Sequence, residues 1–99
     1  MDCQKILNSL KSENFIKINN TGGWFEKGTS IYAKEIKENI FLLFVVLKKL
    51  KLAKVQALIA EFENMSSIGK EEPIQIMFYL SIKNREDFHY FEKYIKIED

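Results

Sequence analysis

The chain has 99 residues, of which 46% are hydrophobic and 29% are charged, and its formal net charge is +1. A chain of this length forms one domain with its own core, and the hydrophobic content excludes intrinsic disorder. The near-zero net charge excludes a strongly basic or acidic protein, so global electrostatics select no class of partner. The charge is uneven, because residues 1–60 carry ten lysines and five acids, whereas residues 61–99 carry five bases and nine acids.

The composition also indicates a compartment. Cys3 is the only cysteine, so no disulfide within the chain is expected. The first residues contain no apolar run of the kind that marks a signal peptide. No stretch approaches the ~20 apolar residues that a membrane-spanning helix needs. We therefore expect a cytoplasmic protein without a membrane partner.

The first expected element is a short helix over residues 2–11. Cys3, Ile6, Leu7 and Leu10 recur at the i, i+3, i+4 and i+7 positions of one helical face. On that face Cys3 is interpreted as a small buried hydrophobic residue rather than a reactive thiol.

A strand is expected over residues 14–20, and the polar and glycine-rich segment 19–28 then ends it. This segment carries Trp24 and Phe25. Two interpretations stay open for the pair. They cover one end of the core, or they form an aromatic anchor for a partner, since such residues dominate interfaces.

The apolar run Ile40–Leu47 is the predicted centre of the fold. Its aromatic and β-branched content favours a strand over a buried helix, and the segment Ser30–Ile36 precedes it through the turn residues Glu38 and Asn39. The two segments therefore predict an antiparallel hairpin. Alternation places Phe41, Leu43, Val45 and Leu47 on one face and Ile40, Leu42, Phe44 and Val46 on the other. Because both faces are apolar, both must be covered by other structure.

A helix is expected over residues 52–64, where apolar residues recur at helical spacing among three alanines. The segment 74–82 alternates as a strand does. A right-handed parallel crossover from Ile40–Leu47 through this helix to 74–82 would fit these lengths.

A final helix is expected from Asn84, which has the side chain of an N-cap. The acids Glu86 and Asp87 follow it in the first turn, near the positive end of the helix dipole. The apolar stripe of this helix is Phe88, Phe91, Tyr94 and Ile95. Together the elements predict an α+β single domain over 1–99, with a mostly antiparallel sheet of three to five strands and three helices.

Catalytic chemistry has little support. The one histidine, His89, is interpreted as a surface or boundary residue, and one Cys with one His cannot supply a usual zinc site. A carboxylate pair for acid–base catalysis is not favoured, because acids in loops and at helix starts are usually solvated. We expect a non-enzymatic protein without metal or cofactor.

The favoured function is therefore that of a binding protein that occludes a protein partner, as toxin-immunity and phage-type inhibitor proteins do. This is an expectation at the level of a class, because no motif matches one such family. The candidate binding residues are Trp24, Phe25, Glu61, Glu63, Glu71, Glu72, Glu86, Asp87 and Tyr90. If the partner is a nuclease, these acids could mimic phosphate groups and steer the encounter.

The alternative is a small nucleic-acid-binding accessory protein that uses Lys48, Lys49, Lys51 and Lys54. Trp24 or Tyr32 could stack on bases in such a complex. Against this function, the chain has a single arginine, Arg85, although arginine is the commonest base-reading residue. A homodimer that pairs through an exposed edge strand is a further expectation.

Overall fold

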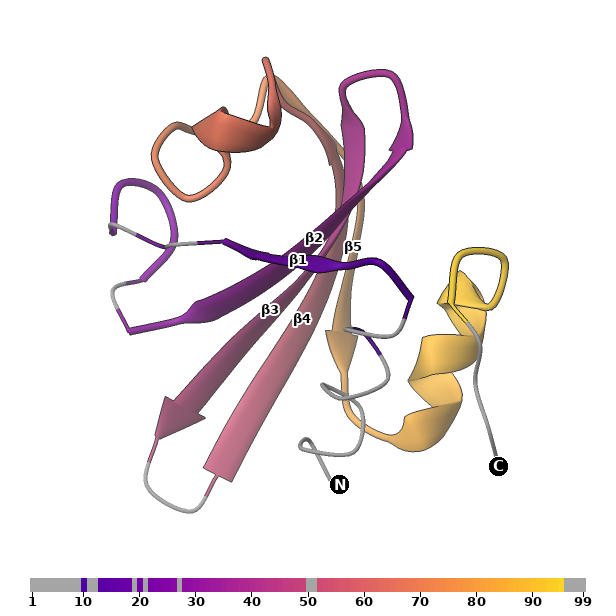
Figure 1. The fold of residues 1–99 in the computed structure, drawn as a ribbon. Coiled ribbons are helices and arrows are strands. Elements are labelled where there is room, and N and C mark those ends of the chain that lie inside the picture. The colour runs from indigo at the N-terminus through magenta and orange to yellow at the C-terminus, as the bar shows by residue number, and fades with distance from the viewer. Residues whose placement is uncertain are drawn as a thin grey trace.

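The computed structural model describes residues 10, 13–18, 20, 22–26, 28–49 and 52–95. These residues form one five-stranded sheet in which sequential strands are neighbours and every pair is antiparallel (Figure 1). The strands are β1 (Ile16–Ile18), β2 (Ser30–Lys37), β3 (Ile40–Lys49), β4 (Leu52–Glu61) and β5 (Gln75–Ile82). Two short 3-10 segments complete the described structure, η1 (Met65–Ser67) and η2 (Arg85–Phe91).

The predicted hairpin between β2 and β3 is confirmed. Lys37 pairs with Ile40, and Glu38 and Asn39 form the turn between them. Asn39 has a φ of 61°, a left-handed conformation that asparagine adopts at lower cost than most residues. Its backbone N–H donates a hydrogen bond of 3.0 Å to the Glu35 carboxylate. The side chain at the end of β2 therefore fixes the turn that leads into β3.

The central strand β3 is buried on both faces, as its continuous apolar sequence predicted. Its residues alternate between two separate hydrophobic clusters. Leu42, Phe44 and Val46 belong to the first cluster, and Phe41, Leu43 and Val45 belong to the second. The sheet thus has a packed layer on each side of its middle strands.

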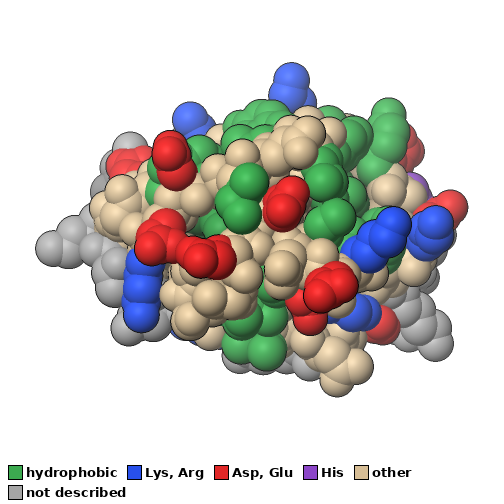
Figure 2. Space-filling view, turned by 90° about the horizontal axis from the view of Figure 1, so that it is seen from above, with side chains coloured by type: hydrophobic (Ala, Val, Ile, Leu, Met, Phe, Trp, Pro, Cys, Tyr) green, Lys and Arg blue, Asp and Glu red, His purple; other side chains and the backbone are tan. Residues whose placement is uncertain are grey.

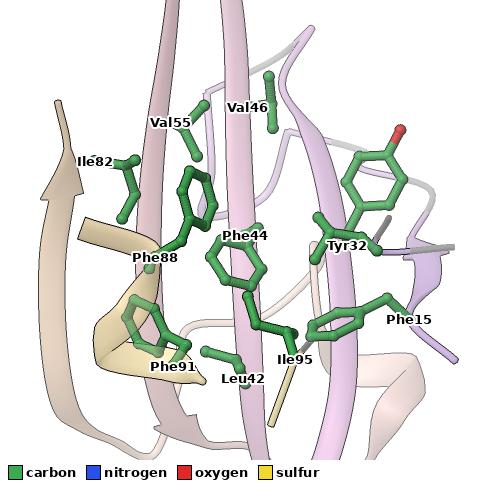
Figure 3. Close-up of a cluster of buried hydrophobic side chains, with 12 residues drawn as sticks. Phe15, Tyr32, Leu42, Phe44, Val46, Val55, Ile82, Phe88, Phe91 and Ile95 are labelled. Atoms are coloured by element: carbon green, nitrogen blue, oxygen red, sulfur yellow. The ribbon is translucent and has the colours of Figure 1, made fainter. Parts of the chain in front are cut away.

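Phe44 is the centre of the first cluster. Its ring lies 5.6 Å from Phe15, 5.6 Å from Phe88 and 5.4 Å from Phe91, measured between centroids. Phe88 and Phe91 belong to η2, which lies across this face of the sheet (Figure 3). The apolar residues of η2 that the sequence selected as a buried stripe therefore cover the face of β3.

The second cluster covers the opposite face. Phe41 on β3 contacts Phe62 at a centroid distance of 6.1 Å, and Ile68 packs in the same cluster. Both Phe62 and Ile68 belong to the connection between β4 and β5. Phe25, from the loop before β2, completes this layer. This layer consists of loop residues, whereas the first contains η2.

The predicted α+β fold class with three helices is wrong. The segment expected as a helix over 52–64 is the strand β4 and the start of the following loop. It pairs antiparallel with both β3 and β5, so the expected parallel crossover is wrong as well. Val55 and Ala57 pack into the first cluster and Leu58 and Ala60 into the second. Burial on both faces removes the alternation of apolar and polar residues by which a strand is recognised.

The last predicted helix is a 3-10 segment of seven residues, η2. Its expected N-cap is confirmed, because the Asn84 side chain accepts a hydrogen bond from the Asp87 N–H. The helix expected over 2–11 lies outside the described residues apart from Leu10, which is buried in the first cluster, and Cys3 is also outside them. Within the described part of the chain, no helix has the length and apolar character needed to span a membrane.

Candidate functional site

The loop that carries Trp24 is closed by the side chain of Asn20. Its amide Nδ2 donates hydrogen bonds to the backbone carbonyls of Glu26, at 2.8 Å, and Thr29, at 3.3 Å. Its Oδ1 accepts one from the backbone N–H of Gly22 at 3.1 Å. One partly buried side chain thus holds both the beginning and the end of the loop.

The same loop packs against the connection between β4 and β5. Gly23 lies so close to the backbone of Lys70 that a Cβ atom at position 23 would collide with the Lys70 carbonyl group. The loop is seen beside the η1 connection in Figure 1. The contact joins two segments that are far apart in the sequence, and only glycine fits there.

Trp24 and Phe25 have different environments within this loop. Phe25 is 8% exposed and belongs to the second cluster, whereas Trp24 is 41% exposed. The two rings meet edge to face, with centroids 4.6 Å apart and an interplanar angle of 87°. Phe25 therefore covers the core, and it supports a neighbouring indole that is partly open to solvent. The core-covering interpretation is confirmed for Phe25, and the partner-binding interpretation stays a prediction for Trp24.

Several acids gather at the end of the sheet where β2 ends and β3 begins. The Trp24 loop leads into the opposite end of β2, and it meets this group through the β4–β5 connection. Lys37, Ile40, Glu61 and Gln75 pair across four strands and define that end. Its acids come from β2, the β2–β3 turn, the end of β4 and the β4–β5 connection, and we call them the acidic end. They are Glu35, Glu38, Glu61, Glu63, Glu71 and Glu72.

The acidic end carries a negative charge and exposed apolar surface. Lys37 and Lys70 are the described basic residues there, so six acids and two lysines leave a formal charge of −4. Five of the six carboxylate residues are exposed and Glu61 is partly buried. Figure 2 views the molecule from this side and shows acidic side chains interspersed with hydrophobic ones. The surface can therefore attract positive charge while offering apolar contact area.

The remaining predicted binding residues lie elsewhere. Glu86, Asp87 and Tyr90 belong to η2, which follows the opposite end of β5. The eight residues of β5 separate the two sites by roughly 23 Å at the usual rise of a strand. The Asp87 carboxylate accepts hydrogen bonds from the backbone N–H groups of Lys83, at 2.7 Å, and Asn84, at 3.2 Å. Asp87 therefore has a structural role as the partner of the N-cap.

The lysines of the nucleic-acid alternative lie around the β3–β4 connection, at the end of the sheet away from the acidic end. The backbone of Lys48 and Lys49 forms the end of β3, but their side chains and the whole of Lys51 are outside the described structure. Lys54 is exposed near the start of β4. The nucleic-acid function stays a prediction.

The described surface offers no obvious catalytic arrangement. The His89 ring nitrogen Nδ1 lies 3.4 Å from the Glu92 carboxylate on the exposed side of the turn. Two shallow grooves flank β1, and Lys17 and Ile18 line both. Neither groove has an acid or a histidine among its described lining residues. No group of three or more potential metal-ligating side chains occurs within the described ranges.

Three residues of this site have no sequence signal for the role that the structure gives them. Asn20 was interpreted as part of a strand ending, and its role as the loop closure depends on carbonyl groups brought near by folding. Glu35 and Glu38 were interpreted only through the hairpin. Their membership of the acidic end follows from the antiparallel order of the strands, which brings the β2–β3 turn beside the end of β4.

Comparisons with protein-family models, curated proteins and solved structures each gave no significant match.

Proposed function

We propose that this chain is a non-enzymatic protein-binding domain. Its acidic end, together with Trp24, covers a basic surface on a partner protein. The observation that carries this proposal is the contact between Gly23 and Lys70, because it joins the loop of a partly exposed tryptophan to the connection that carries Glu71 and Glu72. Interfaces commonly combine an aromatic anchor, which supplies most of the affinity, with surrounding charge, which sets the rate and specificity of encounter.

The rigidity of the loop favours binding over a purely structural role for Trp24. Asn20 closes the loop through three hydrogen bonds, and the Phe25 ring supports the indole from below. An anchor that is held before the encounter loses less conformational entropy when it binds. We therefore assign Trp24 to the interface and Phe25 to the core beneath it.

The charge of the acidic end indicates the chemistry of the partner. Carboxylates that protrude from several loops of one end can occupy positions taken by phosphate groups on a cationic surface. A partner that itself binds nucleic acid, such as a nuclease toxin, has such a surface. The proposed action is occlusion, in which this domain covers the basic site and requires no chemistry of its own.

The experiment is affinity capture from a lysate of the native host with matched variants. The bait is the full chain, and the test variants are Trp24→Ala and the triple charge reversal of Glu63, Glu71 and Glu72 to lysine. The control is Lys54→Glu, which changes an exposed charge at the opposite end of the sheet. Captured proteins are identified by mass spectrometry, and the association rate of the purified partner is then measured at low and high salt.

The proposal expects a basic protein that the wild type and Lys54→Glu retain and that both test variants lose. The association rate should fall as salt rises, because screening weakens long-range attraction. A partner that the charge-reversed variant binds equally well would overturn the proposal. Capture of nucleic acid that Lys54→Glu loses would instead favour the alternative function.

A further inference from the structure

The edge strand β5 has an apolar surface that the proposed interface does not use. Five large hydrophobic residues at and within this strand are between 38% and 63% exposed, namely Ile74, Ile76, Met77, Phe78 and Tyr79. The segment 74–82 contains no charged residue, proline or glycine. Long, uncharged and apolar edge strands are templates for pairing with another strand.

The two edges of the sheet differ in their protection. β1 is the other edge, and it has only three residues, with the charged Lys17 at its centre. Short edge strands and lysine side chains are common defences against edge pairing. β5 has eight residues and neither of these defences. Among the described residues, only β4 pairs with β5, and Figure 3 shows η2 lying over the face of the sheet and not along the outer side of β5.

A bulge explains why the exposed residues are consecutive. Ile59 pairs with Phe78 while Ala60 pairs with Ile76, so Met77 is an extra residue in β5. A bulge breaks strict alternation, and neighbouring side chains can then be exposed together. Phe78 is anchored from the other side by Phe91, at a centroid distance of 5.7 Å. The contact with Phe91 therefore fixes the position of Phe78 within the exposed apolar surface of β5.

The charges that flank β5 identify the strand that fits it. Glu71 and Glu72 precede the strand, and Lys83 follows it. When two copies of such a strand pair antiparallel about a two-fold axis between Met77 and Phe78, Glu72 of each copy lies opposite Lys83 of the other. Opposite charges in such positions stabilise a strand pair, and like charges destabilise it. A parallel arrangement would instead bring acid to acid and lysine to lysine.

We propose that β5 pairs antiparallel with β5 of a second copy of this chain, which gives a two-fold dimer with a continuous ten-stranded sheet. A two-fold interface uses the same surface on both copies and therefore closes. It leaves the short β1 strands at the outer ends, where further growth is disfavoured. The acidic end adjoins this edge at Glu71 and Glu72, but the dimer does not depend on the proposed partner, because pairing of the two β5 strands needs no other protein.

The test is the molar mass of the full chain in solution, measured by light scattering over a concentration series. The wild type should approach twice the chain mass of 11.7 kDa as concentration rises. Tyr79→Lys places a charge opposite the apolar Ile76 of the second copy and should halve the mass. The matched control is Ile16→Lys, which adds the same charge at an apolar residue of β1 that is 53% exposed. It should leave the dimer intact.

Backbone pairing is tested separately by amide hydrogen exchange. Exchange of the 75–82 amides should slow as the wild type dimerises, while exchange in β1 stays unchanged. A monomer at every soluble concentration would overturn the proposal, as would a dimer that Ile16→Lys dissociates and Tyr79→Lys does not. A dimer without concentration-dependent protection of β5 would show a contact through another surface and overturn it as well. Circular dichroism of each variant confirms that the fold is retained.

Discussion

Gly23 lies directly against the carbonyl group of Lys70, with no room for a Cβ atom between them. Together with the packing of Phe25 against Ile68 and Phe62, this contact joins the Trp24 loop to the connection that carries Glu63, Glu71 and Glu72. The close approach of the two backbones in the proposed interface therefore requires glycine at position 23. The aromatic residue Trp24 and these acids come from segments that are about 40 residues or more apart in the sequence, and neither segment alone combines an aromatic anchor with negative charge.

Gly23→Ala should separate these two segments. The added methyl group meets the Lys70 carbonyl and backbone, which cannot move aside as a flexible side chain could. Overpacking of this kind costs about 1–3 kcal/mol, so the free energy of unfolding should fall by that amount. Nuclear magnetic resonance should show shifted amide signals for Lys70 and its neighbours.

The control for this variant is Gly28→Ala. Gly28 has a φ of +91° and open space around it, so an alanine there strains the backbone without a collision. The cost should be about 1 kcal/mol, and the Lys70 amide signal should stay in place. Equal shifts at Lys70 in both variants would contradict the direct contact.

Asn20→Ala should loosen the Trp24 loop while leaving its aromatic residues present. The variant removes three hydrogen bonds and leaves two loop carbonyls without this partner. Such losses cost about 1–3 kcal/mol. Because Trp24 is the only tryptophan, its fluorescence reports on the loop directly, and the emission should shift to longer wavelength. An unchanged emission spectrum and unchanged stability would show that the loop is held by other contacts.

Phe44→Ala should be the most destabilising of these changes. The ring is fully buried and contacts three other phenylalanine rings, from the segment before β1 and from η2. Removal of a buried phenylalanine costs about 3–5 kcal/mol, a large part of the ~5–15 kcal/mol of a typical domain. Urea denaturation measures the loss. Tyr90→Ala is the matched control at an exposed aromatic residue and should change stability by about 0.5 kcal/mol or less.

Asp87→Ala should cost more stability than Glu86→Ala. The Asp87 carboxylate accepts two backbone hydrogen bonds at the start of η2, and a cap of this kind contributes about 1 kcal/mol. Glu86 is an exposed acid in the same turn and shares only the favourable interaction with the helix dipole. Thermal unfolding of both variants compares them. Equal melting temperatures would show that the cap contributes nothing.

The sequence was sufficient where one residue or a local pattern carries the signal. The apolar run at Ile40–Leu47 predicted a strand buried on both faces, because no other placement covers eight consecutive hydrophobic side chains. Asn39 predicted the hairpin turn, and Asn84 predicted a cap, because both signals lie in the side chain and its immediate neighbours. The alternation of residues 74–82 likewise predicted the strand β5.

Contacts between segments distant in sequence determined the secondary structure wherever the local sequence pattern fitted both a helix and a strand. Residues 52–61 have the spacing and the alanines of a helix, yet they form β4, because β3 and β5 supply hydrogen-bonding partners along both of its edges. The same antiparallel order gathers the acids at one end of the sheet and sets Gly23 against Lys70. Propensity acts between near neighbours, whereas a sheet is stabilised by partners distant in sequence. The sequence therefore identified the acidic and aromatic side chains, but the pairing of the strands determined which of them share one surface.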